Sequence, residues 1–350
     1  MQKPLVLVSE HIKTNQQNGQ ELSNDRFPRL DYIEIARMLE ADLLGYDLYS
    51  ASWYHWARQI QSMLKLDFVE SLSVATRSSK YNLVLSASEK VAIPLAASFY
   101  MMKREKPHIV IGHKLSSIRK GRLFSMWPLH ETFSHIICVC RSQLDYTINN
   151  LGISESKADF VYDNVDHNFF RPLKIDIGDY ILAVGQEQRD YKTLLQAMAG
   201  TGLKLVIVAS SHWSNHRLEI ERTEDVTVLE HISYQELRAL YAGARLVVIP
   251  LYDVDYAAGV NSVLEAMAMA KPVVISHGRG VVDYVVHNET GIYTSPGDVE
   301  ELKDTVLSLW GKPRQLDRLG KNARQAVEEE MNLTTYVNRI VQIVHETLAV

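Results

Sequence analysis

Short β-rich runs alternate with helical patterns along this chain, and the alternation begins a second time near residue 172. Such alternation is typical of parallel sheets whose strands are joined by crossover helices. The strands expected in the first half are Leu5–Val8, Tyr81–Ser86, His108–Ile111, His135–Val139 and Asp159–Tyr162. Those expected in the second half are Tyr180–Val184, Leu205–Ala209, Val226–Leu229, Leu246–Ile249 and Pro272–Ile275. The expected helices include Tyr32–Leu44, Val91–Lys103, Tyr191–Ala199, Tyr234–Ala242, Ser262–Ala270 and Tyr336–Leu348.

Two such series predict an α/β protein with two doubly wound domains that face each other across a cleft. We expect an N-terminal domain over residues 1–172, a second domain over residues 173–332 and a final segment over residues 333–350. The final segment is an amphipathic helix that is expected to pack back on the N-terminal domain. Ligands of such sheets bind at the carboxyl ends of strands and at helix N-termini, so the cleft is the expected site.

Charge and composition exclude several classes of protein. The chain has 350 residues and a net charge of −5, which does not suit a nucleic-acid-binding protein. No apolar run approaches the ~20 residues that span a bilayer, and the N-terminus does not resemble a signal peptide, so we predict a cytoplasmic location. The two cysteines, Cys138 and Cys140, lie in one apolar run and are expected to be unbridged core thiols.

The stretch Leu246–Asp298 is the most informative about chemistry. Its first strand ends at Pro250, and Gly259 then precedes a helix for which Ser262 is the expected N-cap. The free N–H groups and the positive dipole end of such a helix suit a diphosphate. Glu265 is expected in the first turn, where its carboxylate can accept hydrogen bonds from the two hydroxyls of a ribose. The alternative is that Glu265 only complements the helix dipole.

Several stretches between residues 163 and 298 carry further motifs. They are Asp163-Asn-Val-Asp166 with Phe170-Arg-Pro172, Ala183-Val-Gly185 with Arg189-Asp-Tyr191, Val228–Ala244, Leu264–Val274, Gly280, Asp283, Glu289-Thr-Gly291 and Ser295-Pro-Gly-Asp298. Together they strongly resemble the family-4 retaining glycosyltransferases, which have the GT-B fold of two Rossmann-like domains. The resemblance is specific over residues 160–300 and thin before residue 100.

This resemblance implies a binding site for a nucleotide-diphosphate sugar. It implies that Arg189 binds phosphate, that Glu265 binds the ribose, and that the backbone N–H groups of Ser262 and Val263 bind the diphosphate. His113 follows the strand His108–Ile111 and is expected to contact the reacting sugar, so His113, Arg189 and Glu265 are the catalytic candidates. A satisfied loop histidine and a surface salt bridge of Arg189 are the alternatives. The remaining donor-binding candidates are Gly185, Ile232, Leu237, Asn261 and Leu264.

One position departs from the family's pattern. Seven residues separate the members of the family's glutamate pair, which places the partner of Glu265 at Ala257. That glutamate contacts the transferred sugar in the family. Ala257 therefore indicates an unusual sugar, substitution by Asp253 or Asp255, or loss of activity, and the two aspartates are equally consistent with solvated loop charges. Gly259 completes the candidate sugar contacts.

A basic segment lies in the first half. Between Lys103 and Arg122 the sequence has seven basic residues and one acidic residue, and Trp127 follows shortly afterwards. A basic and aromatic segment can lie on an anionic membrane surface. A solvated face and a site for an anionic soluble acceptor are the alternatives. The membrane or acceptor candidates are Lys114, Arg119, Lys120, Arg122 and Trp127.

The sequence thus predicts a retaining glycosyltransferase, most simply a hexosyltransferase, that uses a nucleotide-diphosphate sugar, no cofactor and no catalytic metal. The expected acceptor is a hydroxyl of a lipid or a small glycoside, and the expected location is cytoplasmic or peripheral at the inner membrane face. A nucleotide-sugar epimerase of the same fold and a non-catalytic nucleotide-sugar-binding protein are the alternatives. The nucleotide base, the sugar, the acceptor and the oligomeric state are left open.

Overall fold

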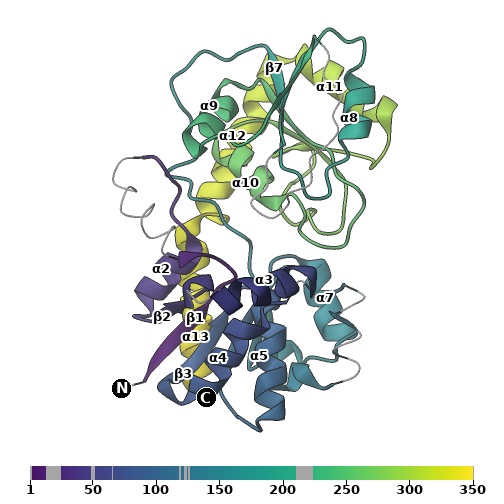
Figure 1. The fold of residues 1–350 in the computed structure, drawn as a ribbon. Coiled ribbons are helices and arrows are strands. Elements are labelled where there is room, and N and C mark those ends of the chain that lie inside the picture. Colours follow the sequence, from purple (N-terminus) through teal and green to yellow (C-terminus); the bar gives the residue numbers. More distant parts are fainter. Residues whose placement is uncertain are drawn as a thin grey trace. The chain divides into compact units, whose positions relative to one another are not determined.

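A computed structural model of the chain describes residues 2–12, 25–48, 52–64, 66–117, 120–121, 124, 127–209 and 224–349. Figure 1 traces the chain through two compact units. Unit 1 contains the described residues of Met1–Asn24, Arg29–Val161 and Thr334–Val350, and unit 2 contains Asp25–Pro28 and Tyr162–Leu333. The chain thus enters unit 2 at Tyr162, before the expected boundary at residue 172, because Val165, Phe169 and Phe170 are buried in the core of unit 2.

Unit 1 is built on a parallel sheet whose described strands have the order β2-β1-β3-β4-β5-β6. The strands are β1 (Lys3–Leu7), β2 (Asp42–Leu44), β3 (Tyr81–Ser86), β4 (His108–Gly112), β5 (His135–Cys138) and β6 (Ala158–Phe160). The helices are α2 (Asp31–Met38), α3 (Ser52–Leu64), α4 (Phe68–Arg77), α5 (Glu89–Met101), α7 (Arg141–Asn149) and α13 (Leu333–Ala349), the last of which belongs to unit 1 from Thr334 onward.

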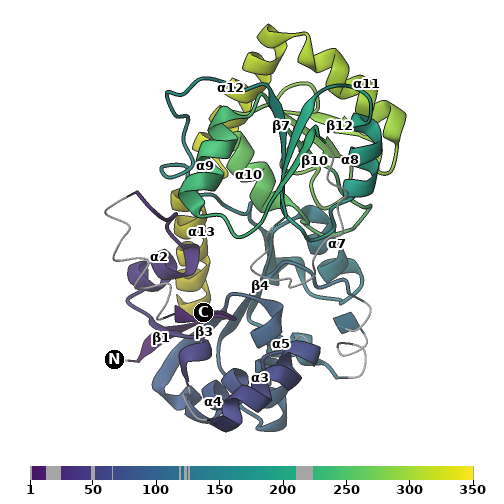
Figure 2. The same cartoon turned by 45° about the horizontal axis from the view of Figure 1, so that its top comes forward.

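Unit 2 carries a second parallel sheet in the order β12-β11-β10-β7-β8-β9. Figure 2 labels its strands β7, β10 and β12. Its strands are β7 (Tyr180–Val184), β8 (Lys204–Val208), β9 (Val226–Leu229), β10 (Leu246–Ile249), β11 (Val273–Ser276) and β12 (Ile292–Thr294). Its helices are α8 (Tyr191–Met198), α9 (Tyr234–Gly243), α10 (Val260–Ala268), α11 (Val299–Trp310) and α12 (Pro313–Glu329). The strand order reverses between β7 and β10, and a doubly wound sheet binds its ligands at this switch point.

The central strands show why the sequence read as continuous apolar runs. In β10 the four residues Leu246–Ile249 are all buried, and β11 is buried along its whole length. Helices cover both faces of a parallel sheet, so its strands lack the alternation of polar and apolar residues that marks a half-exposed strand. The predicted α/β class with two doubly wound sheets is therefore confirmed.

One predicted element was wrong. The helical pattern Tyr32–Leu44 contains the shorter helix α2, which ends at Met38, and the strand β2. Glu40 has a positive φ of 48°, a left-handed conformation that ends the helical path. The apolar residues after it pair with β1 instead, and Leu43 lies opposite Val6. Short apolar runs of this kind fit a helix or a strand equally well until the neighbouring strand is known.

Two further expectations about unit 1 can be checked. Cys138 and Cys140 are buried free thiols, as predicted. Within the described residues, no helix combines the length and the hydrophobicity that crossing a bilayer requires.

The segments that leave and re-enter unit 1 run side by side within unit 2. Val165, which lies in the connection between β6 and β7, forms a parallel bridge with Asn332, just before α13. The N–H group of Val165 donates to the Met331 carbonyl at 3.3 Å, and the N–H group of Leu333 donates to the Val165 carbonyl at 3.0 Å. These hydrogen bonds join the two connections into one element.

Candidate functional site

Two loops meet at the switch point of unit 2. One follows β7 and the other follows β10. The N–H group of Asp190 donates to the Pro250 carbonyl at 3.0 Å, and the N–H group of Tyr252 donates to the Gln188 carbonyl at 3.1 Å. Backbone hydrogen bonds therefore fix the first loop against the second, which leads into α10.

Arg189 lies in the first loop and is 7% exposed. Its Nε donates to the Val184 carbonyl at 2.9 Å, one terminal nitrogen donates to the Glu187 carbonyl at 2.8 Å, and the other donates to Ser262 Oγ at 2.9 Å. A guanidinium has five N–H donors, so two remain. Arg189 makes no ion pair with a carboxylate anywhere in the part of the chain that the structure describes. Burial accordingly lowers the pKa of Arg189.

Two glycines make room for this guanidinium. A Cβ at Gly185, where φ is +104°, would overlap the Arg189 guanidinium, and a Cβ at Gly259 would lie 3.1 Å from its Nη1. Both glycines also have backbone conformations that other residues rarely adopt. The two predicted glycines therefore shape the pocket around Arg189.

The N-terminus of α10 lies next to Arg189. Its N-cap is Gly259 rather than the expected Ser262, which lies inside the helix with its hydroxyl bonded to Arg189. The N–H group of Val263, an expected diphosphate donor, donates to the Gly259 carbonyl at 3.1 Å. Within the described residues, the N–H groups of Asn261 and Ser262 donate no hydrogen bond. The free amides are thus one position earlier than predicted.

Glu265 lies one turn further into α10, beyond the first turn that the sequence predicted. Its side chain faces α9, where the Tyr241 hydroxyl donates to its Oε2 at 2.9 Å. Burial raises the pKa of Glu265 to about 7, although the Tyr241 hydrogen bond and the Arg189 charge oppose this shift. Oε1 makes no hydrogen bond within the described part of the chain. The carboxylate therefore retains capacity to accept hydrogen bonds.

The other donor candidates divide into two groups. Ile232 and Leu237 are half-buried at the start of α9 and pack on the core below it. Leu264 and Val263 are completely buried core residues, so their side chains are not available to a ligand. The motif residues next to Glu265 therefore include core residues as well as candidate binding residues.

Ala257 is half-buried in the loop before α10, and Asp253 and Asp255 are exposed in the same loop. Sequence reasoning missed a third carboxylate near position 257. The hydroxyl of Tyr256, the residue next to Ala257, donates to Glu187 Oε1 at 2.8 Å. Glu187 comes from the β7 loop, and no spacing rule within the β10 segment could have revealed it.

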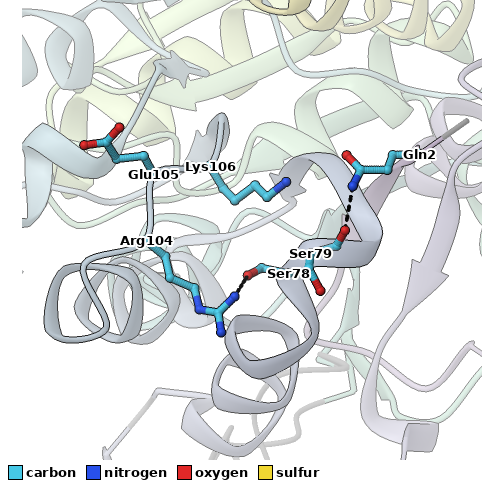
Figure 3. Close-up of a pocket in the computed structure, with 6 residues that line it drawn as sticks. All are labelled: Gln2, Ser78, Ser79, Arg104, Glu105 and Lys106. Carbon is cyan, nitrogen blue, oxygen red and sulfur yellow. Dashed lines mark hydrogen bonds between the residues drawn. The ribbon is translucent and has the colours of Figure 1, made fainter.

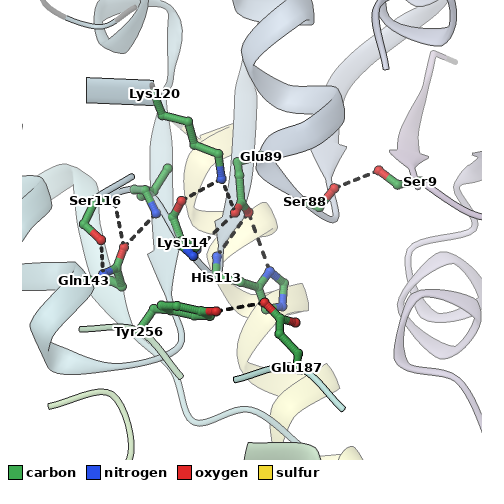
Figure 4. A network of polar contacts seen from close by, with 11 residues as sticks. Ser9, Ser88, Glu89, His113, Lys114, Ser116, Lys120, Gln143, Glu187 and Tyr256 are labelled. Atoms are coloured by element: carbon green, nitrogen blue, oxygen red, sulfur yellow. Dashed lines mark hydrogen bonds and ion pairs between the residues drawn. The ribbon is translucent and has the colours of Figure 1, made fainter. Parts of the chain in front are cut away.

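In unit 1, the expected His113 follows β4 at the carboxyl edge of the sheet (Figure 4). Its side chain is 44% exposed, and its Nδ1 lies 3.8 Å from Oε2 of Glu89, the first residue of α5. Glu89 also accepts hydrogen bonds from the backbone of His113 at 3.3 Å, the backbone of Lys114 at 3.1 Å and Lys120 Nζ at 2.6 Å. This buried carboxylate orients the loop that carries His113.

Electrostatics agrees with that geometry. Burial alone would raise the pKa of Glu89, but the His113 hydrogen bond and the charge of Lys120 outweigh it and hold the pKa well below its usual range. Gln143 of α7 fixes the next part of the loop, since its Oε1 accepts hydrogen bonds from the N–H groups of Leu115 at 2.7 Å and Ser116 at 3.0 Å. Glu89 could have been noticed in the sequence as a glutamate that follows a serine shortly after a predicted strand. Nothing in the sequence singled out Gln143.

The basic segment is only partly described. Arg119 and Arg122 lie outside the described residues. Lys114 is half-buried and Trp127 is exposed. Lys120 pairs with Glu89 at 2.6 Å and also donates to the Lys114 carbonyl, so its charge is used inside unit 1.

A separate hollow in unit 1 lies at the opposite edge of the sheet (Figure 3). Its lining residues directly precede strands or follow α4 and α5, and parallel strands all begin at the same edge. Arg104 donates to Ser78 Oγ at 3.3 Å, and Lys106 donates to the Tyr81 carbonyl at 2.7 Å. Ligand sites of such sheets lie at the carboxyl edge, so this hollow is distinct from the loop of His113.

Comparison with known structures supports the fold. HepE of Anabaena, solved in complex with UDP and glucose, aligns over 99% of this chain and 100% of its own length with a TM-score of 0.70 and 15% identity. Sucrose-phosphate synthase of Thermosynechococcus elongatus aligns over 99% of both chains with a TM-score of 0.71 and 15% identity. At this identity the likeness concerns the fold, which is GT-B.

One family model matches the second half of the chain. Residues 167–326 match the family model described as glycosyl transferases group 1. This matched part of the chain, which holds the Arg189 and α10 site, is similar to the group 1 glycosyltransferases. The match covers the end of the interdomain element and all elements of unit 2 up to α12.

Two relatives illustrate the sequence similarity. The MMP alpha-(1->4)-mannosyltransferase of Mycolicibacterium hassiacum is 25% identical over 228 residues, which are 61% of this chain and 54% of that protein. The capsular polysaccharide biosynthesis glycosyltransferase CapM of Staphylococcus aureus is 22% identical over 277 residues, which are 78% of this chain and 67% of CapM. The chain thus matches about half to two thirds of the length of these relatives.

Proposed function

We propose that this chain is a retaining glycosyltransferase that moves a sugar from a nucleotide-diphosphate sugar to an acceptor hydroxyl without a catalytic metal. The family match supports sugar transfer from a nucleotide sugar. The retained anomeric configuration, the metal independence and a lipid or membrane-associated acceptor belong to the proposal. The proposal needs no metal ion beside the positive groups already described in unit 2, because the departing group is an anion that positive groups can stabilise.

The observation that carries the proposal is the buried guanidinium of Arg189 beside the free amides of α10. A buried charge without an ion-pair partner is costly, and a bound anion would offset that cost. The two unused N–H donors of Arg189 and the N–H groups of Asn261 and Ser262 together suit the diphosphate oxygens. The same groups would stabilise the negative charge that grows as the sugar departs.

Glu265 supplies the ribose contact in this proposal. Its free Oε1 and its position one turn from the helix start suit a hydroxyl pair attached to the diphosphate. Position 257 has alanine where the family has a glutamate. We assign the sugar contact of that glutamate to Glu187, whose carboxylate accepts a hydrogen bond from Tyr256. The exposed Asp253 and Asp255 are the alternative sugar contacts.

His113 has the role of contacting the reacting sugar and the acceptor from unit 1. A half-exposed imidazole on a loop fixed by Glu89 and Gln143 is pre-organised, and it retains access to a ligand. Positioned groups of this kind lower the entropic cost of bringing donor and acceptor together.

The test uses the purified chain and a panel of UDP-, GDP- and ADP-sugars. We expect one nucleotide sugar to raise the melting temperature, since a ligand at a hundred times its Kd adds about 2.7 kcal/mol of stability. Transfer to lipid and glycoside acceptors should then give a product with the donor's anomeric configuration by NMR, and excess EDTA should leave the rate unchanged. An inverted product or EDTA inhibition would reject those parts of the proposal. Donor consumption without acceptor, with an isomerised sugar, would indicate an epimerase.

A further inference from the structure

Helix α3 of unit 1 exposes a continuous apolar stripe. Trp56 is 73% exposed, Ile60 52%, Met63 79% and Leu64 54%. These positions are spaced by four, three and one residues, so they lie on one face of the helix. Large apolar side chains at helical spacing normally face a core, whereas these four face away from their own unit.

The opposite face of α3 is polar and points inward. The Tyr54 hydroxyl donates to Glu70 of α4, and Gln61 Nε2 donates to Glu70 Oε2 at 3.1 Å. Gln61 Oε1 in turn accepts a hydrogen bond from the Val69 N–H group at 2.7 Å. Tyr54, Gln61 and Glu70 are all buried, and Figure 2 shows α3 next to α4. Helix α3 is thus amphipathic with its polar face turned inward. Hydrogen bonds attach that face to unit 1, and the apolar stripe is exposed.

Helix α3 lies at the carboxyl edge of the unit 1 sheet. Arg58 of α3 forms a hydrogen bond with His11 Nε2 at 2.5 Å, and its guanidinium lies 4.3 Å from the ring centre of Tyr46. His11 follows β1 and Tyr46 follows β2, so α3 lies at the carboxyl edge of this parallel sheet. His113 follows β4 at the same edge.

We propose that α3 docks on an anionic lipid surface, with Trp56, Ile60, Met63 and Leu64 inserted at the level of the headgroups. The helix contains no aspartate or glutamate over Ser52–Leu64, although acidic residues outnumber basic ones in the chain by 42 to 37. A helix without acidic residues approaches anionic headgroups without repulsion from its own side chains. Tryptophan is a preferred side chain at this depth.

A second copy of the chain fits this stripe less well. A stable interface between two protein copies uses about 20–30 residues on each side, whereas the stripe consists of four side chains in a single row. A narrow row on a helix that lies along a surface is the pattern of an interfacial helix. The docking element of this proposal is α3; in the basic segment Lys103–Arg122, Lys120 is paired with Glu89.

This inference rests on the proposed function for its purpose, because a membrane at the carboxyl edge would bring a lipid acceptor to the edge that carries His113. Membrane binding can nevertheless be measured without turnover. The experiment is co-sedimentation of the full chain with vesicles of phosphatidylcholine alone or of phosphatidylcholine with phosphatidylglycerol. We expect binding to the anionic vesicles, and we expect the double variant Trp56→Ser/Met63→Ser to reduce the partition coefficient at least tenfold.

Matched variants separate the alternatives. Ile177→Ser removes an exposed apolar side chain of unit 2, and Lys103→Gln/Arg104→Gln removes charge from the basic segment, and both should bind vesicles like the wild type. Vesicle binding that survives Trp56→Ser/Met63→Ser, or that is lost with Lys103→Gln/Arg104→Gln, would overturn the proposal. A dimer in gel filtration that the α3 variant dissociates, without vesicle binding by the wild type, would overturn it in favour of self-association.

The same samples distinguish the failure of this inference from the failure of the proposed function. The α3 variant should keep the melting temperature of the wild type and its shift with the nucleotide sugar, because the substituted side chains are exposed and belong to unit 1. Loss of vesicle binding with an intact nucleotide shift supports docking by α3. Vesicle binding without any nucleotide shift would reject the proposed donor and leave the docking surface in place.

Discussion

The two units use the same kind of parallel sheet but treat buried charge at its carboxyl edge in opposite ways. In unit 2, Arg189 is buried and makes no ion pair among the described residues. In unit 1, Glu89 is buried, pairs with Lys120 and accepts two backbone hydrogen bonds. An unpaired buried charge is prepared for a ligand, whereas a paired one holds a loop in place. Substitutions at the two positions should therefore have opposite consequences for binding and stability.

The largest effect is expected for Arg189→Ala. Removing the guanidinium should weaken the binding of the nucleoside diphosphate at least a hundredfold, about 3 kcal/mol, because charge-assisted hydrogen bonds to the diphosphate are lost. Titration calorimetry measures the change. Lys192→Ala, which removes an exposed lysine from α8, is the matched control and should bind like the wild type. Equal affinities of both variants would place the diphosphate elsewhere.

Glu89→Gln should show the reverse profile. The amide cannot pair with Lys120, so the free energy of unfolding near neutral pH should fall by about 2 kcal/mol while nucleotide affinity stays unchanged. Because the folded-state pKa of Glu89 lies below its ordinary value, its stabilising contribution is present above that value and is lost as the pH falls. Urea unfolding at neutral and acidic pH measures both effects. The exposed Glu105→Gln is the control, and a wild-type-like Glu89→Gln would remove the contrast between the units.

A smaller effect concerns the pH dependence of nucleotide binding. The pKa of Glu265 is about 7, and its ionised form accepts stronger hydrogen bonds from the ribose hydroxyls than its protonated form does. Affinity should therefore rise about tenfold from pH 6 to pH 8, and Glu265→Gln should abolish this rise. The free energy of unfolding without ligand should change in the opposite direction with pH. The pKa of Glu265 is raised in the folded state, so its stabilising contribution is fully present below the ordinary value of 4.5 and is lost as the pH rises through about 7. A flat affinity profile of the wild type would exclude the ribose role.

Tyr241→Phe should give the smallest change. The Tyr241 hydroxyl lowers the pKa of Glu265 through its hydrogen bond, so the substitution should raise that pKa further. A hydrogen bond contributes about 1 kcal/mol, which corresponds to a shift of less than one pH unit in the midpoint of the affinity profile. Calorimetric titrations across pH 6–9 resolve such a shift. A midpoint that moves to lower pH would contradict the assigned contact.

Much of the donor half could be predicted from local pattern. The strands Tyr180–Val184, Val226–Leu229 and Leu246–Ile249 were predicted with the bounds that the structure has, because a strand covered on both faces is a short apolar run between turn residues. Gly185 and Arg189 were implied by the family resemblance and Gly259 by its place before a predicted helix, and the structure brings all three together. The start of α10 was misplaced, since a glycine in a left-handed conformation began the helix before the serine that would have capped it.

What the sequence by itself determined is therefore the α/β class, the restart of the pattern in the second half and the segment that carries the donor motif, because these depend on periods and spacings of a few residues. Only the tertiary structure decided which amides of α10 are free, that Glu187 reaches Tyr256, that Glu89 pairs with Lys120, and that α3 turns its apolar face outward. The free amides follow from the glycine that begins α10, and the other three depend on side chains contributed by other elements. A periodic pattern states which face of a helix is apolar, but the buried Glu70 of α4 decides which face is turned inward.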